Sequence, residues 1–417
     1  MKRLFHILIL FFPILCYGQE VSELIIQDNY KTKESLIRRI TSVKKGTQLD
    51  STLLERDIKI LKRLPSCSHA YYEVIPETDG SVKVIYGFQE NFTIIPSANV
   101  FTTNDDEFAF RIGLFEFNTF GRNIIIGGMF QRDIFNSYGV NFKAPYLFGR
   151  KWGMAINHSN LTTLEPVFFD DGTADYKYNN TSYEIMALFE LNLKNRFEAG
   201  VNYFNEDYEY ESGITNPDVP QDFNVNKLLY KFLYDFNGVD TFYQYLDGFR
   251  STFHFQYVIS TEDVLPDFVI GWNDFFYFKR MGKNGNWANR LRIGFSSNVD
   301  SPFAPFAVDN NLNIRGVGNV IDRGTGAIVL NTEYRHTIYD KKWFVLQGNV
   351  FVDGGSWRNP GGDLGDFGDS ENLRIYPGVG VRFIHKRIFN TVFRIDYGYG
   401  ITKDATNGFV FGIGQYF

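Results

Sequence analysis

Arginine, aspartate and glycine residues in the last third of the chain have types and spacings that could form a buried ion pair. The hexapeptide Asn-Ile-Arg-Gly-Val-Gly holds Arg315 next to Gly316, which lets a loop turn tightly. Further along, Phe351, Asp353 and Gly355 recur with a period of two, so they lie on one face of a strand. An arginine guanidinium can hold a carboxylate by two parallel hydrogen bonds and stays charged. We therefore predict that Arg315, at a loop tip, pairs with Asp353.

Two later segments add charges and small residues to the same candidate site. Gly378, Gly380 and Arg382 alternate along one segment, and Arg394 and Asp396 alternate with aromatic and aliphatic residues along the next. Charged side chains that face lipid cost free energy, so we expect Arg394 and Asp396 to face the interior. The glycines would leave a groove beside the predicted ion pair.

Residues suited to enzymatic or metal chemistry form no recognisable pattern in the sequence. Four histidines fall on separate candidate strands, with no Ser-His-Asp or paired-His spacing: His158, His254, His336 and His385. We predict no enzyme activity, no cofactor and no metal site. A lipase whose serine and histidine meet only in space stays an open alternative. The acidic stretches 170–175 and 363–371 offer oxygen ligands for Ca²⁺, but their spacing fits no calcium loop, and we interpret them as hydrated loops.

The composition favours strands that are apolar on one face only. Aromatic residues make up 18% of the 417 residues, yet the mean hydropathy is −0.22. No helix-length apolar run follows the N-terminus, and nothing in the net charge of −6 indicates nucleic-acid binding. Aromatic residues line both interfaces of membrane barrels, so a membrane barrel accounts for this composition. A soluble, β-rich secreted protein is the alternative.

Residues 91–417 contain about sixteen strand candidates, each long enough to cross a membrane when tilted. We therefore predict an all-β transmembrane barrel of 16 antiparallel strands over this range. The expected spans are 92–102, 108–118, 123–132, 137–147, 151–163, 181–193, 196–211, 227–240, 249–260, 266–281, 286–298, 327–339, 342–357, 373–386, 390–402 and 407–417.

Short and long connections alternate between these candidates. Short turns are predicted at 121–122, 148–150, 194–195, 282–285, 340–341 and 387–389, and long loops at 164–180, 212–226, 299–326 and 358–372. Outer-membrane barrels sort their connections in this way, with short turns on one side and long loops on the other. The connection 241–248 is longer than the pattern requires.

Residues 1–18 have the pattern of a secretory signal peptide. A positively charged start and an apolar run that ends at Leu15 precede small residues and an expected cleavage before Gln19. A lipid-modified Cys16 is the alternative. After cleavage Cys67 would be the only cysteine, and we interpret it as a buried side chain.

Residues 20–90 differ from the rest and predict a small α+β domain. The expected order is strand, helix, helix, strand, strand, in about 70 residues, which is near the lower limit for independent folding. The elements are a strand at 24–26, a helix at 34–40 capped by Thr32, a helix capped by Asp50 with Leu54, Ile58 and Leu61 on one face, and strands at 70–75 and 82–88.

Together these motifs resemble the BamA/TamA superfamily, which includes barrel-assembly proteins and two-partner-secretion translocators. The resemblance rests on the Ile-Arg-Gly loop, the Phe-x-Asp-x-Gly and Gly-x-Gly-x-Arg segments and the terminal Phe417. It implies a 16-stranded barrel whose sixth extracellular loop, here 299–326, folds into the lumen and carries Arg315 toward Asp353. It also implies that residues 20–90 form a POTRA-like domain, and that Phe417 belongs to the C-terminal signal of such barrels.

The resemblance implies that the protein inserts outer-membrane proteins or translocates polypeptides, with the barrel in the outer membrane and the small domain in the periplasm. Dedicated secretion of one partner protein and a passive diffusion porin are the alternatives. The expected partners are membrane lipid, unfolded client polypeptides and accessory periplasmic or lipoprotein subunits, with no nucleic acid. The seam between the first and last strands, near 92–100 and 409–417, would open during transport.

Overall fold

Antiparallel strands close into a single barrel, as the sequence predicts. The computed structural model describes residues 19–102, 108–169, 171–217, 219–242, 244–261, 266–300, 305–308, 313–317, 322–386, 388, 392–403, 405–414 and 416–417. The predicted signal peptide, residues 1–18, lies outside the described residues.

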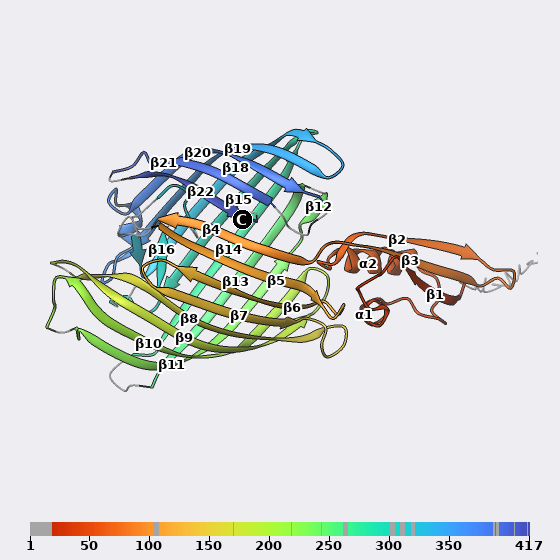
Figure 1. Cartoon of the computed structure of the whole chain (residues 1–417), viewed down its shortest axis with the longest axis horizontal. Coiled ribbons are helices and arrows are strands. Elements are labelled where there is room, and N and C mark those ends of the chain that lie inside the picture. The colour runs from red at the N-terminus through yellow and green to blue at the C-terminus, as the bar shows by residue number, and fades with distance from the viewer. Residues whose placement is uncertain are drawn as a thin grey trace, which may run out of the picture.

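The barrel contains sixteen strands in chain order, so the predicted fold class is confirmed (Figure 1). Each pairs with its neighbours in the sequence, and the last strand returns to the first. The strands are β4 (Ile94–Thr102), β5 (Phe108–Thr119), β6 (Ile124–Arg132), β7 (Asn136–Ala144), β8 (Trp152–Phe169), β9 (Gly172–Glu190), β10 (Asn195–Gly213), β11 (Asp222–Asn237), β13 (Tyr245–Ser260), β14 (Phe268–Met281), β15 (Gly285–Ser296), β18 (Gly326–Asp340), β19 (Phe344–Arg358), β20 (Leu373–His385), β21 (Val392–Tyr399) and β22 (Asn407–Ile413).

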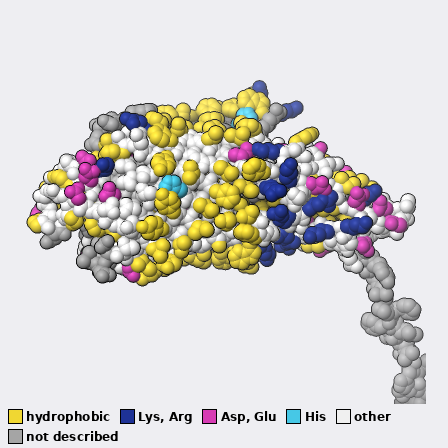
Figure 2. All heavy atoms as spheres, turned by 60° about the horizontal axis from the view of Figure 1, so that its bottom comes forward, with side chains coloured by type: hydrophobic (Ala, Val, Ile, Leu, Met, Phe, Trp, Pro, Cys, Tyr) yellow, Lys and Arg dark blue, Asp and Glu magenta, His cyan; other side chains and the backbone are white. Residues whose placement is uncertain are grey.

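Side chains alternate between the lipid-facing surface and the interior along these strands. On β21, Phe393 and Ile395 are exposed, whereas Arg394 and Asp396 are buried. On β22, Phe409 and Phe411 are exposed on either side of the buried Val410. Because exposed aromatic and aliphatic residues recur on most strands, the outside of the barrel carries the apolar band seen in Figure 2.

A small N-terminal unit lies beyond one end of the barrel (Figure 1). It comprises β1 (Val21–Gln27), α1 (Glu34–Ile40), α2 (Ser51–Lys62), β2 (Cys67–Pro76) and β3 (Val82–Glu90). Its sheet has the order β1-β3-β2, with β1 parallel and β2 antiparallel to the central β3. Neither described helix is both long and apolar enough to cross a bilayer.

Of the two helix N-caps predicted in this unit, one is confirmed and one is wrong. The Asp50 side chain accepts a hydrogen bond from the Thr52 N–H and caps α2 as expected. The prediction that Thr32 caps α1 is wrong: Lys33 is the N-cap residue, and the Thr32 hydroxyl instead accepts a hydrogen bond from Asn118 of the barrel. Cys67 is buried, and burial raises the pKa of its thiol to about 12, so this thiol is unreactive at neutral pH.

The barrel has two rims, one at each end, and only one of them contacts the N-terminal unit among the described residues. We call the rim that contacts it the near rim. There the Lys33 N–H donates to the carbonyl of Gly121 at 2.8 Å, and Arg39 donates to the carbonyl of Tyr146 at 3.0 Å. The turns between β5 and β6, β7 and β8, β9 and β10, β14 and β15, and β18 and β19 lie on this rim. The other end is the far rim.

The prediction of a loop at 164–180 is wrong. Strand β8 extends to Phe169, and strand β9 begins at Gly172. Their ends are held by a buried apolar cluster of Val167, Ala174, Tyr176 and Tyr208. The long connection expected at 241–248 contains a short strand, β12 (Asp240–Phe242), that pairs with the start of β13. On the far rim, β16 (Phe306–Val308) pairs with β17 (Asp322–Gly324), and a 3₁₀ turn spans Leu364–Gly368.

Candidate functional site

Arg315 is fully buried, and its side chain and backbone both bind Asp353 of β19. The Nε atom donates to Oδ2 at 2.8 Å, Nη2 donates to Oδ1 at 3.0 Å, and the backbone N–H donates to Oδ2 at 3.0 Å. This is the two-pronged geometry in which a guanidinium and a carboxylate match best. The structure therefore brings together the two residues that the sequence suggested as partners.

Glu333 of β18 is a second carboxylate at this site, and the sequence reasoning missed it. It accepts from Arg315 Nη1 at 2.7 Å and from Arg382 Nη2 at 2.7 and 2.8 Å, and it also pairs with Arg335. The available signal was the alternation of Asn331, Glu333 and Arg335 along one face, since all three are buried.

Asp396 of β21 completes the cluster. Its Oδ2 accepts from Arg394 Nη1 at 3.1 Å, and its Oδ1 accepts from Asn349 Nδ2 at 3.0 Å and lies 3.6 Å from Arg315 Nη1. We call the four arginines and three acids of this site the lumen cluster: Arg315, Arg335, Arg382, Arg394, Glu333, Asp353 and Asp396. Every member is at least nine-tenths buried, so each charge depends on its partners.

Aromatic rings cover the guanidinium groups of the lumen cluster. The Arg315 guanidinium lies 3.6 Å from the centroid of Phe351 and 4.6 Å from that of Tyr416. Tyr416 also lies 4.8 Å from the Arg394 guanidinium. Such contacts stabilise a cation most where water is excluded.

The last strand is shorter than its predicted span, 407–417. A strand over that span would place Phe417 on one face with Phe409 and Phe411, but β22 ends at Ile413. Gly414 has a φ of +107°, which turns the backbone out of the strand. The Phe417 backbone oxygen then accepts from the buried Arg335 at 3.4 Å, so this residue contacts the lumen cluster.

A second set of charges holds the loop from β14 and β15, the strands that precede β18 in the barrel. Asp274 of β14 accepts from Arg290 Nε and from Arg292 Nε, each at 2.8 Å. Both arginines also donate to the side-chain oxygen of Asn313, at 3.4 and 3.3 Å. Residues 313–317, which lie between β15 and β18 in the sequence, therefore contact inward-facing side chains of β15 as well as those of β18 and β19.

Glycines provide the space into which this loop segment fits. Gly316 has a φ of +93°, and a Cβ there would lie 2.6 Å from the carbonyl oxygen of Gly398. A Cβ on Gly398 would lie 2.2 Å from the carbonyl oxygen of Arg315, and one on Gly380 would lie 2.1 Å from Asp396 Oδ1. Gly355 is buried on the inward face of β19, two residues beyond Asp353. The predicted glycine groove is thus filled by the Arg315 segment and the Asp396 carboxylate.

We predict that Gly398→Ala lowers the free energy of unfolding by about 1–3 kcal/mol, the usual effect of overpacking. The new methyl group would push the Arg315 backbone away from Asp353. The matched control is Gly271→Ala, also within a barrel strand, where the nearest atom to a new Cβ is 3.8 Å away. The midpoint of urea unfolding in detergent measures both variants, and equal midpoints would contradict the close fit.

The seam between β4 and β22 has few backbone partners. Only two residue pairs, Phe411 with Val100 and Gly412 with Asn99, are in register among the described residues. The flanking junctions are longer, with seven pairs between β21 and β22 and nine between β4 and β5. The predicted location of the seam agrees with this geometry, and the seam is much shorter than its neighbours.

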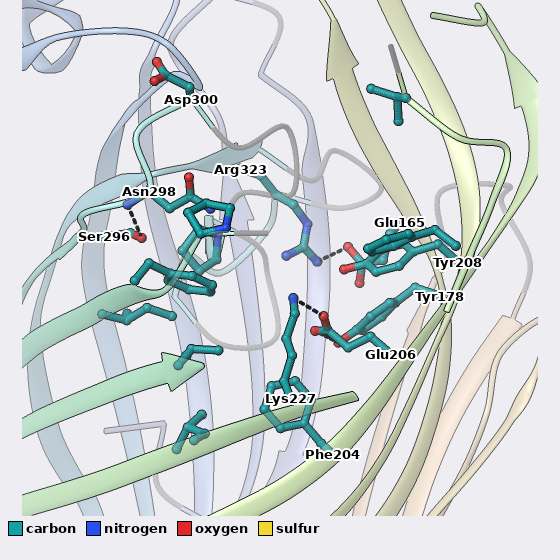
Figure 3. Close-up of a pocket in the computed structure, with 18 of the residues that line it drawn as sticks. Glu165, Tyr178, Phe204, Glu206, Tyr208, Lys227, Ser296, Asn298, Asp300 and Arg323 are labelled. Carbon is teal, nitrogen blue, oxygen red and sulfur yellow. Dashed lines mark hydrogen bonds and ion pairs between the residues drawn. The ribbon is translucent and has the colours of Figure 1, made fainter. Parts of the chain in front are cut away.

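A separate cavity of about 550 Å³ lies toward the far rim, and the sequence reasoning did not anticipate it (Figure 3). Two ion pairs cross it: Arg323 with Glu165 and Lys227 with Glu206, each at 2.5 Å. Aromatic side chains, among them Tyr178, line the rest. Because both cations are already paired, this cavity offers an amphipathic surface rather than a site for one charged ligand.

Searches of family models and of curated protein sequences found no match to this chain. Several solved structures match it by shape. The BamA structure from Haemophilus ducreyi that lacks POTRA domains 1–3 matches with a TM-score of 0.58 and 15% identity, over 95% of this chain and 84% of that one. CdiB from Escherichia coli matches with a TM-score of 0.66 and 10% identity, over 95% and 76% of the two chains.

CdiB from Acinetobacter baumannii matches similarly, with a TM-score of 0.63 and 11% identity, over 95% of this chain and 73% of that one. At these identities the likeness concerns the fold. The fold implied by the sequence resemblance is therefore confirmed: this chain has the fold of the BamA and CdiB barrels.

Proposed function

We propose that the protein inserts client polypeptides into the outer membrane through the seam between β4 and β22. The single observation that carries this proposal is the two-pair seam, because a junction with so few hydrogen-bonded pairs costs least to open. An opened seam exposes the backbone N–H and C=O groups of two edge strands. Unpaired edges bind other strands, so an incoming β-hairpin could pair with them.

The N-terminal unit would capture the client first. In the sheet order β1-β3-β2, the outer edges of β1 and β2 pair with no other described strand, although Val21 at the start of β1 bonds to Gly46 and Thr47. An extended polypeptide that adds to such an edge is held by main-chain hydrogen bonds, which makes capture tolerant of sequence. In this proposal the unit is a POTRA-like domain in the periplasm, and it delivers the client to the near rim.

The lumen cluster would hold the loop around Arg315 and the inward-turned C-terminal segment while the seam opens. Arg335 contacts Phe417, and Arg394 contacts Tyr416, so the cluster connects the loop to the residues that follow β22. Because the lumen cluster holds these segments in place, the barrel would open only where β4 meets β22. The proposed function involves no enzymatic step.

Depletion of the protein followed by quantitative outer-membrane proteomics tests the proposal. A fall in many β-barrel proteins, with lipoproteins unchanged, is expected for insertion. The loss of one surface protein would instead indicate dedicated secretion. An unchanged proteome together with lower ion permeability would indicate a porin and contradict the proposal.

A further inference from the structure

The near rim carries a ring of positive charge mixed with exposed apolar side chains. In Figure 2, Lys and Arg side chains gather between the apolar band of the barrel and the N-terminal unit, and they continue onto that unit. Eight exposed cations contribute to this ring, which we call the basic rim: Arg122, Arg150, Lys151, Lys194, Arg280, Lys283, Lys341 and Lys342.

These cations are not neutralised by the protein itself. None of the eight forms an ion pair with another described residue. The sequence also contains no Asp or Glu in the turn segments that hold them, 120–123, 145–152, 191–196, 279–284 and 341–343. On the far rim, the segment 359–372 has four carboxylates and no Lys or Arg.

Each turn of the basic rim combines its cations with an exposed apolar residue. Phe148 is 64% exposed beside Arg150 and Lys151, and Trp343 is 50% exposed beside Lys341 and Lys342. The other turns repeat this combination, with Phe120 near Arg122, Leu191 near Lys194, and Met281 near Lys283. Aromatic and long basic side chains at one level are typical of the membrane interface, where rings sit among headgroups and cations reach the phosphates.

We propose that the basic rim binds anionic phospholipid headgroups in the membrane leaflet on the side of the N-terminal unit. The ligand is a lipid with a net negative phosphodiester, of the phosphatidylglycerol type. A soluble polyanion would need only the charges, whereas the apolar residues of the rim are continuous with the lipid-facing band. This continuity favours a lipid. The proposal does not depend on the client or on the opening of the seam.

Binding would also fix the N-terminal unit relative to the membrane. Arg63 of this unit lies 3.4 Å from Glu190 at the end of β9, and Arg39 contacts the turn that carries Arg150. The last turn of α2 adds two further cations to this unit, Lys59 and Lys62. Anionic headgroups between the rim and these helices would hold the unit close to the membrane surface.

The experiment uses the full mature chain in nanodiscs that contain phosphatidylcholine and phosphatidylglycerol, and native mass spectrometry of the lipids that stay bound. We expect phosphatidylglycerol to be enriched over its share in the disc, by up to about five-fold for each cation that contacts a headgroup. The enrichment should fall as salt rises, because exposed charges are screened.

The test variant is R150Q/K151Q/K342Q, and the matched control is R132Q/K177Q/K403Q, which removes the same charge from the far rim. Heat-modifiable migration on a gel verifies folding. Enrichment should fall in the near-rim variant and stay at the wild-type value in the control. Equal enrichment in all three proteins would overturn the proposal, as would wild-type enrichment that does not respond to salt. If no lipid is enriched but an acidic peptide binds tightly, the rim binds a soluble polyanion instead, which also overturns the proposal.

Discussion

Arg315→Ala is expected to lower the free energy of unfolding by about 3–5 kcal/mol, because it leaves buried carboxylates without their partner. Arg315 has no exposed surface and supplies three of the bonds to Asp353 and Glu333 from its side chain. Removing the guanidinium also uncovers the Phe351 ring beneath it. The measurement is the urea midpoint of the purified barrel, followed by its heat-modifiable migration.

An exposed ion pair provides the matched control for Arg315. Lys177 lies 2.7 Å from Glu209, and both side chains are more than one-third exposed. Solvent and salt weaken such a pair, so Lys177→Ala should change stability by less than about 1 kcal/mol. Equal effects of the two substitutions would contradict the structural importance of the lumen cluster.

The conservative variant Arg315→Lys separates geometry from charge. Lysine keeps the positive charge but cannot reproduce the two parallel bonds to Asp353 or the flat stacking on Phe351. We expect an intermediate loss of stability together with reduced client insertion. An Arg315→Ala barrel that folds normally and handles clients normally would remove the proposed role of the cluster.

The sequence predicted the partners of Arg315 only in part, for a physical reason. Asp353 was found because period-two spacing assigns residues to a strand face without knowledge of register. Glu333 and Arg335 lie on the same kind of face, but nothing local connects them to a loop residue. Their proximity depends on the pairing of β18 with β19, which sets Glu333 opposite Phe351.

Strand length was predicted poorly in the long hairpin of β8 and β9. The acidic residues Asp171 and Asp175 favoured a hydrated loop at 164–180. The hairpin is instead closed by Val167, Ala174 and Tyr176, which alternate with those charges and pack on Tyr208. Polarity on one face of a strand therefore concealed packing on the other.

The end of the chain was misplaced because alternation does not report where a strand stops. Phe409, Phe411 and Phe417 are separated by even numbers of residues, so a continuous strand would place them on one face. The positive φ of Gly414 ends this alternation, and Tyr416 then lies over Arg315 and Arg394. A glycine just before the last aromatics was the available signal, since glycine adopts this conformation without strain.

A disulfide across the seam is expected to abolish client insertion while leaving the fold intact. Val100 and Phe411 face each other in register and are exposed on the lipid side, so Val100→Cys with Phe411→Cys places two thiols in bridging position. Cys67 can remain, because it is buried and its pKa is raised to about 12. Oxidation would tie β4 to β22, and reduction would release them.

The matched control joins two strands that need not separate. Ile112 and Phe130 face each other across β5 and β6 and are also exposed on the lipid side. Ile112→Cys with Phe130→Cys should form its disulfide to the same extent and leave function unchanged. Each single-cysteine variant reports any effect of the substitution alone.

The direct measurement is the level of outer-membrane β-barrel proteins in depleted cells that carry only the seam pair, compared before and after reduction of the disulfide. The Ile112–Phe130 control should give the wild-type level throughout. For the Val100–Phe411 pair we expect a depleted level under oxidising conditions and recovery after reduction. A wild-type level with the Val100–Phe411 disulfide fully formed would show that clients do not pass through this junction.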